Sequence, residues 1–187
     1  MSHANQVDTP VIRLLDAQGV PYVLLPHPEP VFTVAAAAAQ RGVVAEEMVK
    51  SILLRESRSD RYTMACVLGP ARLDHRAVRA ALGEGWGRLT FAGDDEILAV
   101  TGYPRGAVNP LCLPDHVPVI FDATIAHCRR VNISTGDPMA GLELDPADLI
   151  RLAGARLAPI SEEAQGAGKQ GSGGAGVNQT DQRPLTY

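Results

Sequence analysis

Residues 49–68 read VKSILLRESRSDRYTMACVL, and this stretch decides the fold class. Two mainly apolar runs, Val49–Arg55 and Tyr62–Leu68, stand on either side of the polar segment Glu56–Asp60. Short runs of this composition that are joined through a polar turn predict two antiparallel strands. A β-hairpin is therefore the starting point from which the rest of the chain can be interpreted.

Helices and strands are intermixed on both sides of this hairpin. Thr9-Pro10 predicts the start of a helix that Gly19 ends, and Thr33 predicts the cap of a second helix that Gly42 ends. Further helical segments are expected at 45–48, 74–82, from 94 onward and at 145–153, and further strands at 21–25, 89–91, 117–121, 130–134, 141–144 and 156–160. The order follows no regular βαβ pattern, which favours an α+β fold with a mixed sheet over a doubly wound fold.

The composition is that of one globular domain. The chain has 187 residues, of which 45% are hydrophobic and 20% charged, and a single domain usually has about 100–200 residues. Residues 9–160 are expected to form the domain, residues 1–8 a flexible N-terminus, and the Gly/Ser-rich residues 161–187 a disordered tail. No apolar run approaches the ~18 residues of a membrane-spanning helix, and the polar N-terminus shows no secretory signal, so a cytoplasmic location is expected.

The net charge limits the choice of partners. At -4, it argues against a general nucleic-acid coat protein, whose phosphate contacts require a basic surface. It does not exclude the recognition of one end of an RNA. Neither DNA nor a membrane is expected as a partner.

The cysteines and histidines do not indicate a metal site. Cys66, Cys112 and Cys128 form no C-x-x-C pair and are odd in number, so they are expected to be reduced thiols. Cys112 with His116, followed by the adjacent His127 and Cys128, does not have a standard zinc-ligand spacing, because adjacent strand residues point to opposite faces. We expect no metal and no cofactor.

Lys50 is the most informative single residue. Alternation along the strand puts Lys50 on the same face as Ile52 and Leu54. One interpretation is a lysine whose stem lies on the core while its ammonium group reaches solvent. The other is a cation at the mouth of a pocket, where it pairs with a phosphate or a polarised carbonyl.

The segment Gly102–Pro110 is the second candidate. Gly106 would let the backbone approach a ligand closely, and successive N–H groups in such a loop can bind an anion. The glycines and prolines also fit an ordinary connecting loop. His27 lies in a proline-rich segment whose fixed backbone would direct it toward a site, although most such histidines are exposed to solvent.

No motif of a catalytic nucleophile is present. The sequence contains neither G-x-S-x-G nor G-x-x-x-x-G-K-[ST]. An enzyme built on this chain would work by positioning, by backbone donors and with help from the substrate. Arg72, Arg76 and Arg79 form a basic stripe near the helix at 74–82, which is either a solvated face or a contact for an RNA backbone.

In their order and spacing, a series of segments resembles the YbaK/ProX family, the free-standing relatives of the prolyl-tRNA synthetase editing domain. The resemblance runs from about Thr9 to Ile160. The segments that carry it are Pro26-His27-Pro28, Val49–Leu54, Arg72-Leu73-Asp74, Thr101-Gly102-Tyr103, Gly106–Pro110, Val119–Asp122, Val131–Gly136 and Leu144–Leu149. The resemblance implies a curved mixed sheet surrounded by several short helices.

The function implied by this resemblance is that of an aminoacyl-tRNA deacylase. Such an enzyme hydrolyses the ester between a wrong amino acid and a tRNA, usually proline tRNA carrying alanine or cysteine. The family lysine falls on Lys50 and the first glycine of its loop on Gly106, which are the implied catalytic residues. The implied substrate-binding residues are His27, Val31, Phe32, Thr33, Ser51, Ala107, Val108, Asn109, Pro110, Asp122 and Gly136.

Two positions depart from the family pattern. Ala107 stands where many members have a second glycine, and Asn109 stands where Ser or Thr is usual. Ala107 is tolerable if its φ stays negative, and the Asn109 side chain is expected to narrow the pocket to a small amino acid. The expected partners are a mischarged aminoacyl-tRNA, held at its acceptor end, and an aminoacyl-tRNA synthetase. The competing hypothesis is a binding module that keeps the fold without catalysis.

Overall fold

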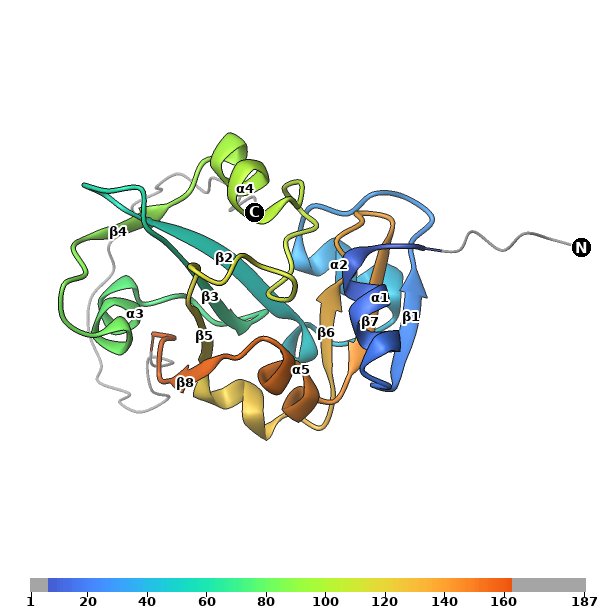
Figure 1. Cartoon of the computed structure of the whole chain (residues 1–187). Coiled ribbons are helices and arrows are strands. Elements are labelled where there is room, and N and C mark those ends of the chain that lie inside the picture. The colour runs from blue at the N-terminus through green and yellow to red at the C-terminus, as the bar shows by residue number, and fades with distance from the viewer. Residues whose placement is uncertain (1–6, 163–187) are drawn as a thin grey trace, which may run out of the picture.

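The computed structural model describes residues 7–162 (Figure 1). The flexible N-terminus and disordered tail expected from the sequence lie mostly outside the described residues. The helices are α1 (Pro10–Ala17), α2 (Val34–Arg41), α3 (His75–Leu82), α4 (Asp94–Thr101) and α5 (Pro146–Leu152), with 3-10 turns η1 (Ala45–Glu47) and η2 (Ala123–His127). The strands are β1 (Tyr22–Pro26), β2 (Val49–Glu56), β3 (Tyr62–Leu68), β4 (Leu89–Phe91), β5 (Val119–Asp122), β6 (Val131–Ser134), β7 (Ala140–Leu144) and β8 (Arg156–Ala158).

The strands form two sheets. The five-stranded sheet has the order β4-β2-β3-β5-β8 and is mixed, because β3 pairs parallel with β5 and β5 parallel with β8. The three-stranded sheet has the order β1-β7-β6 and is antiparallel. The predicted hairpin is confirmed as β2 and β3, in a register that opposes Val49 to Leu68 and Arg55 to Tyr62. The α+β class with a mixed sheet is confirmed, and the division into two sheets is new.

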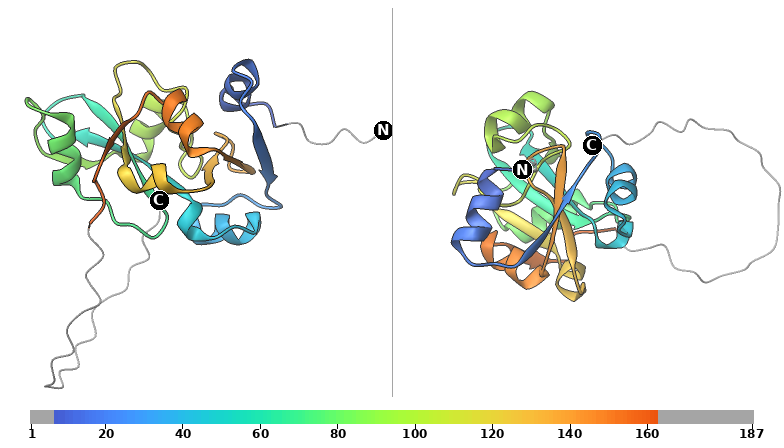
Figure 2. Two further views of the ribbon diagram at one scale, coloured as in Figure 1. Left: turned by 90° about the horizontal axis from the view of Figure 1, so that it is seen from below. Right: turned by 90° about the vertical axis from the view of Figure 1, so that its right-hand side faces the viewer.

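The two sheets share one hydrophobic core. Phe121 and Met64 of the larger sheet join Leu142 and Ile133 of the smaller sheet in one buried cluster, which α1 covers through Leu15. Helices α1 and α2 lie on opposite sides of the smaller sheet (Figure 2). A second cluster of aliphatic side chains lies under α3. No helix within residues 7–162 has the length and hydrophobicity required to cross a membrane.

Side-chain caps define where the helices begin. Thr9 Oγ1 accepts a hydrogen bond from the Ile12 N–H at 3.3 Å, and Thr33 Oγ1 accepts one from the Ala36 N–H at 3.1 Å. Asp74 caps α3 in the same way. Such caps typically contribute about 1 kcal/mol each. The helix starts expected at Thr9, Thr33 and Asp74 are therefore confirmed, and side-chain hydrogen bonds to the first backbone N–H groups explain them.

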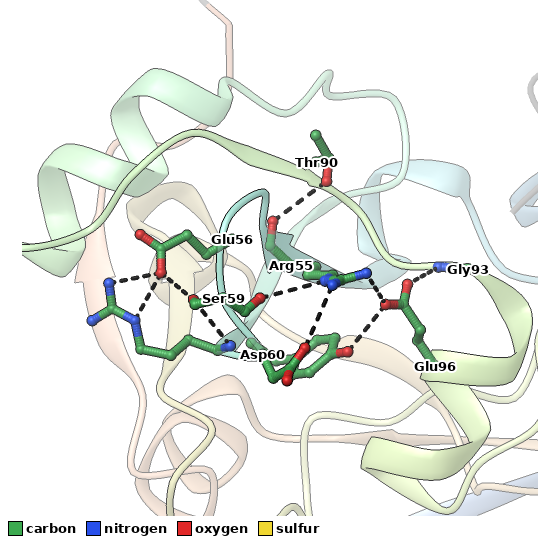
Figure 3. A network of polar contacts seen from close by, with 9 residues as sticks. Arg55, Glu56, Ser59, Asp60, Thr90, Gly93 and Glu96 are labelled. Carbon is green, nitrogen blue, oxygen red and sulfur yellow. Dashed lines mark hydrogen bonds and ion pairs between the residues drawn. The ribbon is translucent and has the colours of Figure 1, made fainter.

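A polar network ties α4 and β4 to the β2–β3 hairpin (Figure 3). Arg55 Nη1 donates to Glu96 Oε1 at 2.8 Å, and Glu96 Oε2 accepts from the Gly93 N–H at 2.7 Å. Thr90 Oγ1 donates to the Arg55 carbonyl at 3.5 Å. These bonds hold both elements beside β2, and they thereby fix the start of the Gly102–Pro110 loop that follows α4.

Candidate functional site

A cavity of about 930 Å³ opens between α2, the first half of β2, β4 and the start of α4. Its size lies within the range of ligand pockets, about 300–1,000 Å³. The loop after β3 forms one wall and residues 105, 106 and 108 form another. Of the site residues implied by the resemblance, its lining contains Val31, Phe32, Thr33, Lys50, Ser51, Gly106 and Val108. Arg72 of the basic stripe also lines it.

Lys50 is held at the wall of this cavity. Strand β2 directs it to the face that also carries Ile52, and its Nζ donates to the Ala71 carbonyl in the loop after β3. The side chain is half-buried, and this burial lowers the pKa of the Lys50 ammonium group. The lysine is thus a partly desolvated cation in a fixed position, and neither a flexible surface group nor a core residue.

Gly106 occupies a position that only glycine fits without strain. Its φ is +85°, a left-handed conformation that other residues rarely adopt. A Cβ added here would lie 2.9 Å from Phe32 Cδ1 and 3.1 Å from the Val31 carbonyl oxygen. The loop therefore packs directly on the segment that leads into α2, and these two segments form one end of the cavity.

Three backbone donors of this loop have no acceptor within residues 7–162. The Ala107 N–H donates to the Pro104 carbonyl at 3.0 Å, so it is already engaged in a turn. Within residues 7–162, the N–H groups of Arg105, Gly106 and Val108 donate to no other protein group, and all three residues line the cavity. The anion-binding capacity expected of the loop is therefore kept by these donors, of which Gly106 and Val108 stand on either side of the engaged Ala107.

The two departures from the family pattern have structural explanations. Ala107 is fully buried, and among residues 7–162 only Cys112 combines a side chain with a positive φ, so Ala107 adopts a conformation that alanine tolerates. The Asn109 amide is also buried: its Nδ2 donates to the Ser134 carbonyl and its Oδ1 accepts from the Leu111 N–H at 2.8 Å. Asn109 ties the loop to β6 and is not part of the cavity lining. The expectation that its side chain narrows the pocket is therefore corrected.

Besides Ala107 and Asn109, four other implied residues lie outside the cavity lining: His27, Pro110, Asp122 and Gly136. Pro110 is buried, and Gly136 packs against the ring of Tyr103, whose hydroxyl donates to the Leu111 carbonyl at 2.8 Å. Asp122 accepts from the N–H groups of residues 160 and 161 at 2.9 and 2.8 Å and so holds the chain after β8. The role of these residues as substrate contacts remains a prediction.

His27 is paired with Arg41, a cavity residue that the sequence analysis missed. The Arg41 Nε donates to His27 Nε2 at 2.9 Å, which requires the other ring nitrogen of His27 to carry the proton that it donates to the Pro138 carbonyl, at 3.0 Å. Arg41 Nη1 donates to the Ile133 carbonyl at 3.1 Å, and burial lowers the Arg41 pKa to about 10. A Cβ at Gly141 would lie 2.0 Å from Arg41 Cζ, so the strand leaves room for the guanidinium.

The protein is expected to lose stability on mild acidification because of this pair. Burial, reinforced by the charge of Arg41, lowers the His27 pKa below its usual 6.5, against smaller opposing effects of Pro138 and Asp137. The unfolded chain therefore binds the proton first, so the contribution of His27 is complete above pH 6.5 and is lost as the pH falls through the lowered pKa, by at most about 1.4 kcal/mol per pH unit.

The measurement is the free energy of unfolding between pH 5 and 7 for the wild type and for His27→Gln, whose amide oxygen can still accept from Arg41. The variant is expected to show a shallower decline over this range. His116→Gln, at an exposed position, is the matched control and should keep the wild-type slope. Equal slopes for the wild type and His27→Gln would contradict the prediction.

Thiol and metal chemistry find no support at this site. Burial raises the pKa of the Cys66 thiol to about 12, which keeps it a poor nucleophile. Within residues 7–162, no group of three or more His, Cys, Asp or Glu side chains is placed to hold a metal ion. The groups that the cavity offers include the Lys50 ammonium, the guanidinium groups of Arg41, Arg72 and Arg105, and backbone N–H donors, which suit an oxyanion or a phosphate.

Two solved structures are similar to this chain over most of its length. The hypothetical protein APE2540 is 30% identical with a TM-score of 0.73, and the alignment covers 81% of this chain and 99% of that one. A candidate trans-editing enzyme for prolyl tRNA synthetase is 25% identical with a TM-score of 0.69, and the alignment covers 83% of this chain and 99% of that one.

Sequence comparison points to the same group of proteins. Proline–tRNA ligase of Pelobacter propionicus is 31% identical over 93 residues, which are 50% of this chain and 16% of the ligase. The chain thus spans a small part of the length of this curated relative. The model of the aminoacyl-tRNA editing domain matches residues 28–152, which include Lys50, Gly106 and most of the cavity wall. The chain therefore belongs to the aminoacyl-tRNA editing domain family.

Proposed function

We propose that this protein is an aminoacyl-tRNA deacylase that acts in trans on mischarged tRNA, with a small amino acid on proline tRNA as its substrate. The observation that supports the proposal is a cavity whose lining includes both Lys50, with its ammonium group, and Gly106 and Val108, whose N–H groups donate to no other group within residues 7–162. A cation and two backbone donors at one cavity match the needs of an ester whose carbonyl oxygen becomes negative during hydrolysis.

In the proposed reaction, a nucleophile adds to the ester carbonyl and the oxygen becomes an oxyanion. The Gly106 and Val108 N–H groups stabilise this charge, a role that contributes about 2.7–4 kcal/mol per donor in other acyl-transfer enzymes. Lys50 holds the terminal nucleotide or the carbonyl. The nucleophile is water, which a ribose hydroxyl of the substrate can orient, or the thiol of a cysteinyl substrate. The bond to the ribose oxygen then breaks and this oxygen takes up a proton. The products are a tRNA with a free hydroxyl and either the free amino acid, when water attacks, or a cyclised one, when the cysteine thiol attacks.

Alanine esters are expected to be hydrolysed faster than phenylalanine or tyrosine esters, by about tenfold or more. The cavity wall near α2 includes the small and aliphatic side chains of Val34, Ala37 and Met48, of which Ala37 and Met48 are themselves buried. Close-packed walls of this kind resist enlargement for a ring. A panel of mischarged tRNAs measures this preference. Faster hydrolysis of an aromatic ester would show that the cavity accepts large side chains and would reject the proposed specificity.

A binding module without catalysis is the alternative that the two family departures favour. It would hold an aminoacyl group, a nucleotide or a partner protein in the same cavity. Two observations reduce the support for this alternative. Ala107 has no positive φ, and the Asn109 amide bonds to the Ser134 carbonyl and the Leu111 N–H. Binding of a non-hydrolysable aminoacyl-adenosine analogue without turnover of the matching ester would favour it.

Contacts to the tRNA outside the cavity are proposed at the basic stripe. Arg76 and Arg79 are exposed on α3, whereas Arg72 precedes the helix, lines the cavity and pairs with Glu162 at 3.3 Å. The three therefore do not form one helical row. Because the chain has a net charge of -4, tRNA recognition is proposed to be local and weak, at the acceptor end.

A further inference from the structure

Two of the three phenylalanines of this chain are exposed at the same cavity. Aromatic residues make up 4% of the sequence, and Phe121 is fully buried in the core. Phe32 is 54% exposed and Phe91 is 65% exposed, and both line the cavity described above. Since Phe91 leaves most of its surface in water, its placement is not explained by packing in the core.

The backbone around Phe91 is held rigidly. Phe91 pairs with Leu54 of β2. On one side of it, Thr90 Oγ1 donates to the Arg55 carbonyl (Figure 3), and on the other the Ala92 N–H donates to the Leu53 carbonyl at 3.1 Å. A ring on such a strand is already in place before a ligand arrives, which lowers the entropic cost of binding.

His75 braces the Phe91 ring. The two rings meet edge-on, with centroids 4.8 Å apart and an interplanar angle of 84°. The His75 Nδ1 lies 3.2 Å from the Leu89 carbonyl, so the imidazole is itself fixed to β4. His75 also lines the cavity. The pair forms an ordered aromatic surface at the wall.

The position of Phe91 relative to Lys50 identifies the part of a substrate that would reach it. Lys50 and Leu54 are four residues apart on β2, or about 13 Å at 3.3 Å per residue. Phe91 stands opposite Leu54 and therefore on the same face of the sheet. A small aminoacyl group does not span this distance. A tRNA whose ester lies at Lys50 would reach Phe91 only with its nucleotides.

We propose that Phe91, braced by His75, is a stacking platform for a nucleobase of the single-stranded acceptor end. This inference rests on the proposed function and names a subsite for the same substrate. Unpaired bases stack on exposed aromatic side chains without regard to sequence. The same cavity carries the ion pairs Arg105–Asp94 and Arg72–Glu162, so charged groups interrupt the exposed apolar surface to which Phe91 belongs. A protein partner would need a larger contiguous surface.

The first test measures stacking without catalysis. The probes are two short RNAs that end in CCA, one with 2-aminopurine as the last base and one with it as the penultimate base. Full-length wild type is expected to quench the fluorescence of at least one probe, Phe91→Tyr to keep this quenching and Phe91→Ala to lose it. Absence of quenching by the wild type, equal quenching by Phe91→Ala, or equal loss in Phe91→Tyr and Phe91→Ala would overturn the proposal.

The second test measures deacylation of aminoacyl-tRNA. Phe91→Ala is expected to lower kcat/KM by about 5- to 150-fold, mainly through KM, since stacking on one aromatic side chain typically accounts for a factor of this size. Phe91→Tyr should restore the wild-type value. Leu98→Ala is the matched control, because Leu98 is 54% exposed on α4 and does not line the cavity. An unchanged KM in Phe91→Ala would contradict the platform. Failure of the wild type to hydrolyse any ester would reject the proposed function, and the fluorescence test would still decide on the platform.

Discussion

Lys50→Ala is expected to lower kcat/KM for deacylation by about 100- to 1,000-fold and to leave the protein folded. Lys50 lines the same cavity as the proposed oxyanion donors, and loss of one stabilising donor in other enzymes has an effect of this size. Burial lowers the pKa of the Lys50 ammonium group and so disfavours its charged form, which offsets the loss of the hydrogen bond to the Ala71 carbonyl. The free energy of unfolding is therefore expected to change little.

This combination separates a catalytic role from a structural one. Initial rates on a mischarged tRNA and the midpoint of thermal unfolding are measured for the wild type, Lys50→Ala and Lys50→Arg. Lys50→Arg keeps a cation with a different shape and should fall between the other two in rate. Full activity of Lys50→Ala would remove Lys50 from the mechanism. If Lys50→Ala lost activity and stability to the same extent, the role of Lys50 would be structural rather than catalytic.

Gly106→Ala is expected to lower kcat/KM by about 100-fold or more. The new methyl group would lie 2.9 Å from the Phe32 ring and 3.1 Å from the Val31 carbonyl, and the left-handed conformation adds about 1–2 kcal/mol of strain. The loop must move to relieve both, and the Gly106 and Val108 N–H groups move with it. A displacement of about 1 Å in a catalytic group can lower a rate by about 100-fold.

Gly102→Ala provides the matched control. Gly102 ends α4 with a φ of +74°, and a Cβ there would meet nothing within 4 Å. It therefore carries the same kind of conformational strain without the contact to Phe32 and Val31. Gly102→Ala should reduce stability slightly and keep activity. If both variants lost activity equally, strain in the chain rather than the position of the backbone donors would explain the effect.

The local features of this fold are predictable because their causes are local. The caps at Thr9, Thr33 and Asp74 satisfy N–H groups two or three residues away, and the β2–β3 hairpin closes through a short polar turn. The division into two sheets is different, because β1 pairs with β7 more than 110 residues later in the chain. The neighbours of strand β5 are likewise set by distant pairing, because this strand lies between β3 and β8 and is parallel to both.

In the candidate site, too, the residues with a local cause could be predicted and those with distant partners could not. Lys50 and Gly106 stand out in the sequence because strand alternation and the glycine-rich loop give each a local reason to face a ligand. Asn109 looked like a pocket residue, but its partner Ser134 lies 25 positions away and turns it inward. Arg41 was missed because a basic residue in the last turn of a helix is common. Only the fold brings its guanidinium to His27 and over Gly141.

The central claim is that the cavity at Lys50 and Gly106 hydrolyses an aminoacyl ester. The measurement that tests it most directly is release of alanine from proline tRNA charged with alanine, followed over several equivalents of substrate per protein, with and without a non-hydrolysable aminoacyl-adenosine analogue. The account predicts turnover well beyond one equivalent and competitive inhibition by the analogue. Tight binding of the analogue to a protein that releases no alanine would contradict it.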